Sequence, residues 1–289
     1  MAGMKRDEIL ANPTAANEAV KEITEAAAKS PLPVADLPPA DLVTLPGGLM
    51  YKGKLIRSAI VRELNGEHEE ALARAIQSKN PYHFLDTLMT SGTVRLGDLD
   101  DAETRKMLPE LLIGDRDEIV LGIRTATYGD VVEVFGWSCP ACGAPLDKLS
   151  FSLEEDIDRK NMADPAGESV FEVKLRNGRA KVRLITAGVL ASAHDMPNLT
   201  VPQQNDIILS KTIETWTDKH GQTHLIPGFP SMVRQMSSPD RQKILRELSD
   251  RQPGPRYTEI GFKHDGCGEE VTLALGITDL FRDLLVGIV

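Results

Sequence analysis

Two short stretches, CPACG at residues 139–143 and HDGCG at residues 264–268, have the same spacing and lie 125 residues apart. In each stretch, called a knuckle below, two residues separate a pair of possible metal ligands and a glycine follows directly. Such a gap lets both side chains of a tight turn point at one ion, and two knuckles supply the four tetrahedral ligands that zinc prefers. Thiolates disfavour magnesium and calcium, and a closed shell leaves no position for a catalytic water. The spacing predicts a structural Zn²⁺ site formed by Cys139, Cys142, His264 and Cys267.

The same offset of 125 residues relates a longer part of the chain. Between residues 115 and 143, seven of 29 positions are identical to their counterparts, where ordinary composition would give about two. Cys139 falls opposite His264, and Trp137 falls opposite Phe262. We therefore expect an internal duplication, with a first repeat over residues 48–160 and a second over residues 161–289, each carrying one knuckle.

Local patterns in the first repeat predict both strands and helices. Residues 49–61 are strand-like on either side of Lys52-Gly53-Lys54, which indicates a hairpin. Helices are expected over residues 66–78 and 81–90. A third helix is expected to have Asp115 as its N-cap and Gly129 just past its end. The run VVEVFGWS then predicts a strand that leads into the first knuckle.

The second repeat shows the same order of signals. FEVKLRNGRAKVRLI, residues 171–185, predicts a hairpin with Asn177-Gly178 at its turn. A helix is expected around residues 204–216, including Trp216, and another around 239–250, capped by Asp240. The fold class predicted from these signals is α+β, with two pseudo-repeated halves (hairpin, helices, strand, knuckle) joined by a zinc-ribbon-like site.

The N-terminal 47 residues have a different composition. Residues 5–29 predict a helix with a weak apolar stripe, and residues 31–48 are rich in proline. Such a segment suits an extended arm better than a packed element. We expect residues 1–47 to be a helix and proline-rich arm that docks against a partner protein.

Overall charge and composition argue against several classes of function. The formal net charge is -10, which argues against nucleic acid or an anionic membrane as the main partner. No run of about 18 apolar residues and no signal-peptide core is present. Three cysteines, an odd number, favour metal ligation over a disulfide framework. No phosphate-binding glycine loop, nucleophile elbow or paired catalytic carboxylate stands out, so a catalytic role is not expected.

Other polar clusters have simpler explanations. His220 and His224 have helix-type metal spacing, but Gly221 between them indicates a loop. Residues 67–70 (EHEE) lack a zinc-protease pattern and fit a solvated helix face, and residues 97–101 (GDLDD) fit a helix-capping loop.

Taken together, the motifs resemble those of a family of phage proteins. The order is LPGGLMY, LLIGDRDEIVLGIRTATYGDVVEV, the CPACG knuckle, VKLRNGRAKVRLIT and GFKHDGCG, spread over residues 43–285. This arrangement resembles the baseplate hub subunit and hub-assembly proteins of contractile-tailed bacteriophages. The resemblance implies that the four knuckle residues bind the metal. His264 stands where the family usually has a cysteine, and residues 184–192 depart from the more acidic segment of the family.

The resemblance implies a structural or assembly protein at the tail baseplate or tip. Its expected partners are other tail and baseplate proteins, reached through the arm and the body, and its expected location is the virion, with the host cytoplasm during assembly. One alternative is a tail assembly chaperone that is absent from the mature particle. Another is a cellular zinc-ribbon module that binds nucleic acid, which the acidic balance disfavours.

Overall fold

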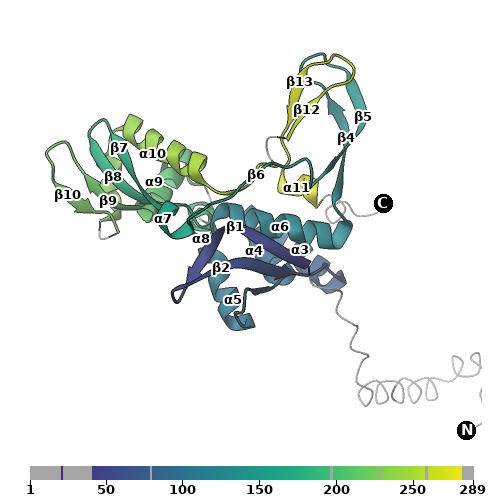
Figure 1. Cartoon of the computed structure of the whole chain (residues 1–289), viewed down its shortest axis with the longest axis horizontal. Coiled ribbons are helices and arrows are strands. Elements are labelled where there is room, and N and C mark those ends of the chain that lie inside the picture. The colour runs from purple at the N-terminus through teal and green to yellow at the C-terminus, as the bar shows by residue number, and fades with distance from the viewer. Residues whose placement is uncertain are drawn as a thin grey trace, which may run out of the picture. The chain divides into compact units, whose positions relative to one another are not determined.

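The computed structural model of the chain describes most of the residues after position 40 (Figure 1). The described residues are 21 and 41–281, except 79, 196–197, 228 and 258–259. The chain divides into two units, residues 1–39 and 40–289. The predicted N-terminal helix and the first part of the arm therefore lie outside the described residues, apart from residue 21. Among the described helices, none is long and apolar enough to cross a bilayer.

The first half of the described chain, residues 41–160, contains strands, helices and a long hairpin in that order. Its elements are β1 (Asp41–Tyr51), β2 (Lys54–Val61), α3 (Gly66–Gln77), α4 (Pro81–Gly92), β3 (Thr93–Leu96), α5 (Asp101–Met107), η1 (Leu108–Glu110), α6 (Ile113–Tyr128), β4 (Val131–Ser138), β5 (Pro145–Ser152) and β6 (Arg159–Lys160).

The second half, residues 161–281, begins with a short helix and continues in a similar order. Its elements are α7 (Pro165–Glu168), β7 (Val170–Leu175), β8 (Gly178–Arg183), α8 (Ala187–His194), α9 (Val201–Thr212), β9 (Ile213–Thr217), β10 (Thr223–Leu225), η2 (Pro230–Gln235), α10 (Ser238–Arg251), β11 (Gly254–Pro255), β12 (Ile260–Lys263), β13 (Glu270–Leu273) and α11 (Ile277–Leu280). Helices and strands are mixed along the chain, which confirms the α+β class.

The first sheet has the order β1-β2-β3, and its strands are antiparallel. Tyr51 pairs with Lys54 across a two-residue turn, as the hairpin prediction required. The prediction that residues 41–47 belong to the arm is wrong, because they form the first part of β1. Pro46 is accommodated there because the pairing register shifts between Thr44 and Leu49, and proline is tolerated at such irregularities.

The second sheet has the order β10-β9-β8-β7. Its hairpin is confirmed, but the turn is Arg176-Asn177 and lies one residue earlier than predicted, since Gly178 already pairs with Leu175 as the first residue of β8. Helix α9 ends at Thr212, so the prediction that Trp216 lies in a helix is wrong. Trp216 lies in β9 and pairs with Ala180 of β8. The β-branched and aromatic residues that follow Thr212 suit a strand, and this local preference ends the helix one turn early.

Both predicted helix caps at aspartates are wrong by three residues. Helix α6 has Leu112 as its N-cap, and α10 has Ser237. Asp115 instead accepts hydrogen bonds from the backbone N–H groups of Gly47 (2.7 Å) and Gly48 (3.3 Å), and Asp240 accepts one from Arg176 N–H (2.7 Å). Burial raises the pKa of Asp115 to about 6, against the effect of the two backbone donors. Each aspartate thus ties its helix to the hairpin of the same half.

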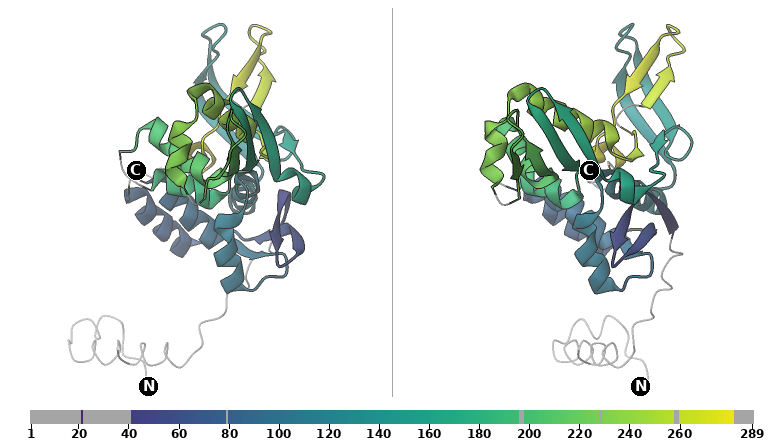
Figure 2. Two further views of the ribbon diagram at one scale, coloured as in Figure 1. Left: turned by 90° about the vertical axis from the view of Figure 1, so that its left-hand side faces the viewer. Right: turned by 60° about the vertical axis from the view of Figure 1, so that its left-hand side comes forward.

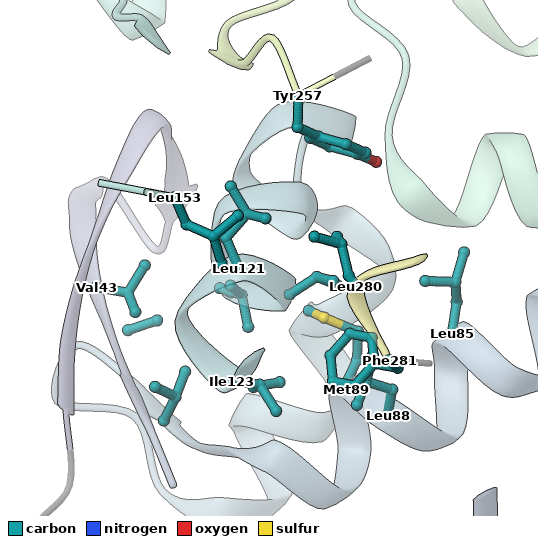
Figure 3. Close-up of a cluster of buried hydrophobic side chains, with 14 of the residues drawn as sticks. Val43, Leu85, Leu88, Met89, Leu121, Ile123, Leu153, Tyr257, Leu280 and Phe281 are labelled. Atoms are coloured by element: carbon teal, nitrogen blue, oxygen red, sulfur yellow. The ribbon is translucent and has the colours of Figure 1, made fainter. Parts of the chain in front are cut away.

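Among the described residues, two large apolar cores are each built mainly from one half, and a small third cluster contains Leu112, Met162 and Leu184. The first core joins β1–β3 to α3, α4 and α6, and it also includes side chains of the last described residues, Leu280 and Phe281. Figure 3 shows Phe281 and Leu280 beside Met89 and Leu88, and Phe281 packs edge-on against Phe84 at 6.2 Å. The second core joins β7–β9 to α9 and α10. Because the last described residues pack into the first core, the second half cannot be removed without opening the first.

The two halves also meet at two glycines with no room for a side chain. A Cβ atom on Gly114, in the first turn of α6, would lie 1.7 Å from the carbonyl oxygen of Pro253. A Cβ atom on Gly254, in β11, would lie 2.4 Å from the Cα atom of Gly114. The start of α6 therefore touches the β11 segment backbone to backbone.

Candidate metal centre

Two hairpins carry the knuckles at their tips. Strands β4 and β5 form one hairpin and strands β12 and β13 the other, and they lie side by side in Figures 1 and 2. Their registers are equivalent at the offset of 125 residues. Trp137 pairs with Leu146 in the first, and Phe262 pairs with Val271 in the second.

The two knuckles have the same backbone hydrogen bonds. Cys139 N–H donates to the carbonyl of Ala144 (2.9 Å), and His264 N–H donates to that of Glu269 (2.9 Å). The glycine after each second ligand donates back to the first ligand residue, at 2.8 Å from Gly143 and 2.7 Å from Gly268. Both glycines have positive φ, 73° and 75°, a conformation that side chains with a Cβ rarely adopt. The glycine in each motif is thus explained by the turn.

All four predicted ligands come together in one cluster. The Sγ atoms of the three cysteines and a ring nitrogen of His264 lie within 4.8 Å of one another. Cys139 Sγ is 3.9 Å from Cys267 Sγ, and His264 Nδ1 is 3.5 Å from Cys142 Sγ and 3.2 Å from Cys267 Sγ. Zn–S and Zn–N bonds in a regular tetrahedron give S···S edges of about 3.8 Å and S···N edges of about 3.6 Å. The donor set and its spacing therefore fit a tetrahedral metal ion.

Burial divides the ligands into an inner and an outer pair. Cys139 and His264, the first residues of the two knuckles, are buried, and Cys142 and Cys267 are exposed. Burial raises the pKa of the Cys139 thiol, but the N–H groups of Cys142 and Ala141 and the neighbouring thiols outweigh it, and the net pKa is lowered. At Cys267, the N–H of Glu269 favours the thiolate, yet burial and the neighbouring thiols raise the net pKa. A divalent cation would let all three sulfurs ionise together.

An aromatic pair lies two residues before the first ligand residue of each knuckle, where the two hairpins contact one another. The rings of Trp137 and Phe262 lie 5.3 Å apart at equivalent positions of the two hairpins. Both side chains are half-buried and pack against the first core. This contact joins the hairpins independently of the metal and holds the two turns face to face.

Gly266 is a further residue of the metal centre, and the motif did not single it out. A Cβ atom there would lie 2.8 Å from Cε1 of the His264 ring. We expect Gly266→Ala to turn the imidazole away and weaken Zn²⁺ binding by about 10–100-fold, as changes next to metal ligands do. Competition of the purified protein with a chromogenic chelator measures this affinity.

Gly261→Ala is the matched control, since Gly261 lies in β12 of the same hairpin and an added Cβ meets nothing within 4 Å. Equal zinc affinity of the two alanine variants would contradict a ring position that depends on Gly266.

The weaker metal candidates do not join this cluster. His220 lies in a turn, and His224 lies on β10, where its Nε2 is 3.3 Å from Asp218. The EHEE segment lies in the first turns of α3, where His68 completes a capping box with Asn65. The loop at residues 97–101 supplies Asp100, which caps α5 as expected.

Comparison of the chain with protein-family models, with curated proteins and with solved structures finds no match.

Proposed function

We propose that this chain is a structural or assembly protein of a bacteriophage tail baseplate, and that Cys139, Cys142, His264 and Cys267 hold one structural Zn²⁺ in a zinc-ribbon-like site. The observation that carries the zinc is the tetrahedral spacing of three sulfurs and one imidazole nitrogen from two separate hairpins. Four protein ligands fill the shell of zinc, so the ion joins the hairpins and has no open position for a substrate. One equivalent of zinc per purified chain is the expected content.

His264 tests the ligand set directly. His264→Cys is expected to keep one equivalent of zinc, because a thiolate at this position gives a four-cysteine site that zinc also accepts. His264→Ala is expected to lose affinity by at least about a hundredfold, since a ligand is missing from a closed shell. Elemental analysis of both dialysed variants distinguishes them. Full zinc content in the alanine variant would remove His264 from the site.

The two halves are, under this proposal, copies of one ancestral unit. Each sheet has a hairpin followed in sequence by two helices and a third strand. In each sheet, one residue near the start of the third strand is left out of the pairing register. Val61 pairs with Thr93 directly after a register shift, and Val182 pairs with Ile213 after an equivalent shift. The matching knuckles and hairpin registers support the same origin. Residues 48–160 and 161–289 are the corresponding copies, with the first strand of the first copy beginning earlier, at residue 41.

The tail assignment rests on the resemblance in sequence, and four of its motifs coincide with features of the fold. LPGGLMY contains Gly47 and Gly48, whose N–H groups donate to the Asp115 carboxylate, and the GDR motif lies at the start of α6. CPACG and GFKHDGCG carry the two knuckles. Gly114 of the second motif contacts the backbone of Pro253 and Gly254. Asp115 of the same motif joins α6 to β1 by accepting a hydrogen bond from Gly47 N–H. These contacts support a role for the motifs in building the fold.

Mass spectrometry of purified phage particles tests the tail assignment. A baseplate component is expected in fixed proportion to the other tail proteins. An assembly chaperone would be bound to baseplate intermediates and absent from mature particles. Normal tails from a phage that lacks the coding sequence would refute both roles.

The arm is proposed to reach a neighbouring tail protein. Because residues 41–47 lie in β1, the deletion must stop earlier, and residues 1–39 are the segment to remove. We expect this variant to keep its Tm and zinc, while its incorporation into particles falls by about tenfold or more, because proline-rich segments lose little entropy on docking. Thermal unfolding and immunoblots of purified tails measure the two effects. A large loss of Tm would mean that the segment belongs to the core instead.

A further inference from the structure

The outer face of the β1–β2–β3 sheet carries apolar side chains that point away from the first core. Val43, Ala59 and Val61 point inward and are buried, whereas Leu42 and Ile60, which precede Val43 and Val61 along the strands, point outward. Leu42 is 71% exposed and pairs across the strands with Ile60. A hollow of about 470 Å³ lies on this face, and its apolar lining includes Leu42, Leu55, Ile56 and Ile60.

The second sheet provides an internal comparison for this face. Ala59 pairs with Leu96 in the first sheet as Ala180 pairs with Trp216 in the second. The pairing therefore places Lys181 where the first sheet has Ile60. The residues that pair with these two on the neighbouring strand are Leu42 and Glu172.

The face of the second sheet is solvated and charged. Glu172 pairs with Arg179, and Glu214 pairs with both Lys181 and Arg183. The same sheet geometry is thus stable with ions at these positions, so the fold does not require an apolar pair. Exposed apolar clusters rimmed by polar groups are typical of surfaces that a partner covers.

Basic side chains surround the apolar centre of the first sheet's face. Four basic and two acidic residues line the hollow: Lys52, Lys54, Arg57, Arg95, Asp98 and Glu103. Lys52 pairs with Glu103, and Arg57 donates to two backbone carbonyls. Within the described part of the chain, neither Lys54 nor Arg95 takes part in an ion pair. This excess of positive charge lies on a protein of net charge -10.

We propose that the outer face of the β1–β2–β3 sheet binds an acidic segment of another protein, whose apolar side chains enter the hollow while its carboxylates meet Lys54 and Arg95. A second copy of this chain fits poorly, because the same basic rim would face itself. Nucleic acid fits poorly as well, since Leu42 and Ile60 offer a phosphate backbone nothing to pair with. The inference does not depend on the tail assignment, because it rests on the two sheets alone.

A peptide selection tests this surface without knowledge of the natural partner. The full chain is panned against a display library of random peptides of about 12 residues, with Leu42→Glu/Ile60→Lys as the counter-target. That variant carries the residues found at the equivalent positions of the second sheet, so it is expected to fold, and its circular dichroism melt checks this. The most enriched peptide is then labelled, and its binding is measured by fluorescence anisotropy.

The enriched peptides are expected to be net negative and to contain Leu, Ile, Val or Phe. Binding of the labelled peptide should weaken by about tenfold or more in Leu42→Glu/Ile60→Lys and in Lys54→Glu/Arg95→Glu. The matched control, Glu172→Gln/Lys181→Gln on the second sheet, should bind as the parent does. The proposal is overturned by a lack of enrichment, by neutral or basic peptides, by equal binding of all variants, or by a parent dimer that Leu42→Glu/Ile60→Lys dissociates in sedimentation.

Discussion

Removing zinc from the purified protein should lower its Tm by about 8–16 °C. A ligand present at a thousand times its Kd stabilises the folded state by about 4 kcal/mol. For a chain of this size, each kcal/mol moves the Tm by about 2–4 °C. Differential scanning fluorimetry with and without a strong chelator measures the change. Acid should act in the same direction, because the thiols must lose their protons to bind zinc.

The loss should begin at the C-terminal hairpin. Strands β12 and β13 have four residues each and, among the described strands, pair only with one another; an isolated two-stranded hairpin is marginally stable. Without the metal, the hairpin keeps the contact between Trp137 and Phe262 and the packing of Ile260 and Leu273 in the first core. Limited proteolysis of the chelated protein should therefore cut first near residues 260–273.

Cys142→Ser provides the matching variant. Cys142 is exposed, so the substitution removes a ligand without leaving a cavity in the core. It should melt like the chelated parent and be insensitive to chelator. If the metal-free protein has the same Tm as the zinc-loaded parent, the metal cluster does not stabilise the fold.

Gly114→Ala is expected to destabilise the protein by more than about 4 kcal/mol or to prevent folding. The added Cβ would lie 1.7 Å from the Pro253 carbonyl oxygen, and this neighbour is backbone, which cannot rotate away. The start of α6 would have to move from β11, and a shift there disturbs the contact between the halves. Effects of this size are typical of overpacking against a rigid neighbour. Urea unfolding monitored by circular dichroism measures the change.

Gly66→Ala is the control for this glycine substitution. Gly66 begins α3, and an added Cβ there meets nothing within 4 Å. Its free energy of unfolding should stay within about 0.5 kcal/mol of the parent value. If Gly114→Ala unfolds at the same urea concentration as Gly66→Ala, the backbone contact between α6 and β11 is not as close as described.

The sequence predicts the metal cluster well because its signal is local. A two-residue gap and a glycine specify each knuckle, and the repeat offset links the two. Both hairpins of the sheets are also predicted, since a tight turn between strand-like runs needs no distant partner. The α+β class follows from the same local patterns.

The sequence-based predictions are wrong where contacts with residues far away in the sequence determine the local structure. Aspartate is a common helix N-cap residue, and this makes Asp115 a plausible cap. Its carboxylate instead accepts hydrogen bonds from the N–H groups of Gly47 and Gly48, which are far away in the sequence. The proline-rich composition before residue 48 hides the start of β1, since pairing with β2 overrides it. Gly266 has no sequence signal of its own, because only the folded position of the His264 ring shows why a side chain is excluded.

The four predicted ligands come from two hairpins that are far apart in the sequence, and this separation has a consequence for protein synthesis. A ribosome adds about 5–20 residues per second, so the first pair of cysteines emerges about 6–25 s before Cys267 can complete the cluster. During that interval Cys139 and Cys142 form an exposed dithiol that can be oxidised or can bind a metal ion too weakly to keep it. A nascent chain stalled before residue 264 should therefore lose zinc on dilution, and the ion would be held firmly only after the β12–β13 hairpin has emerged from the ribosome.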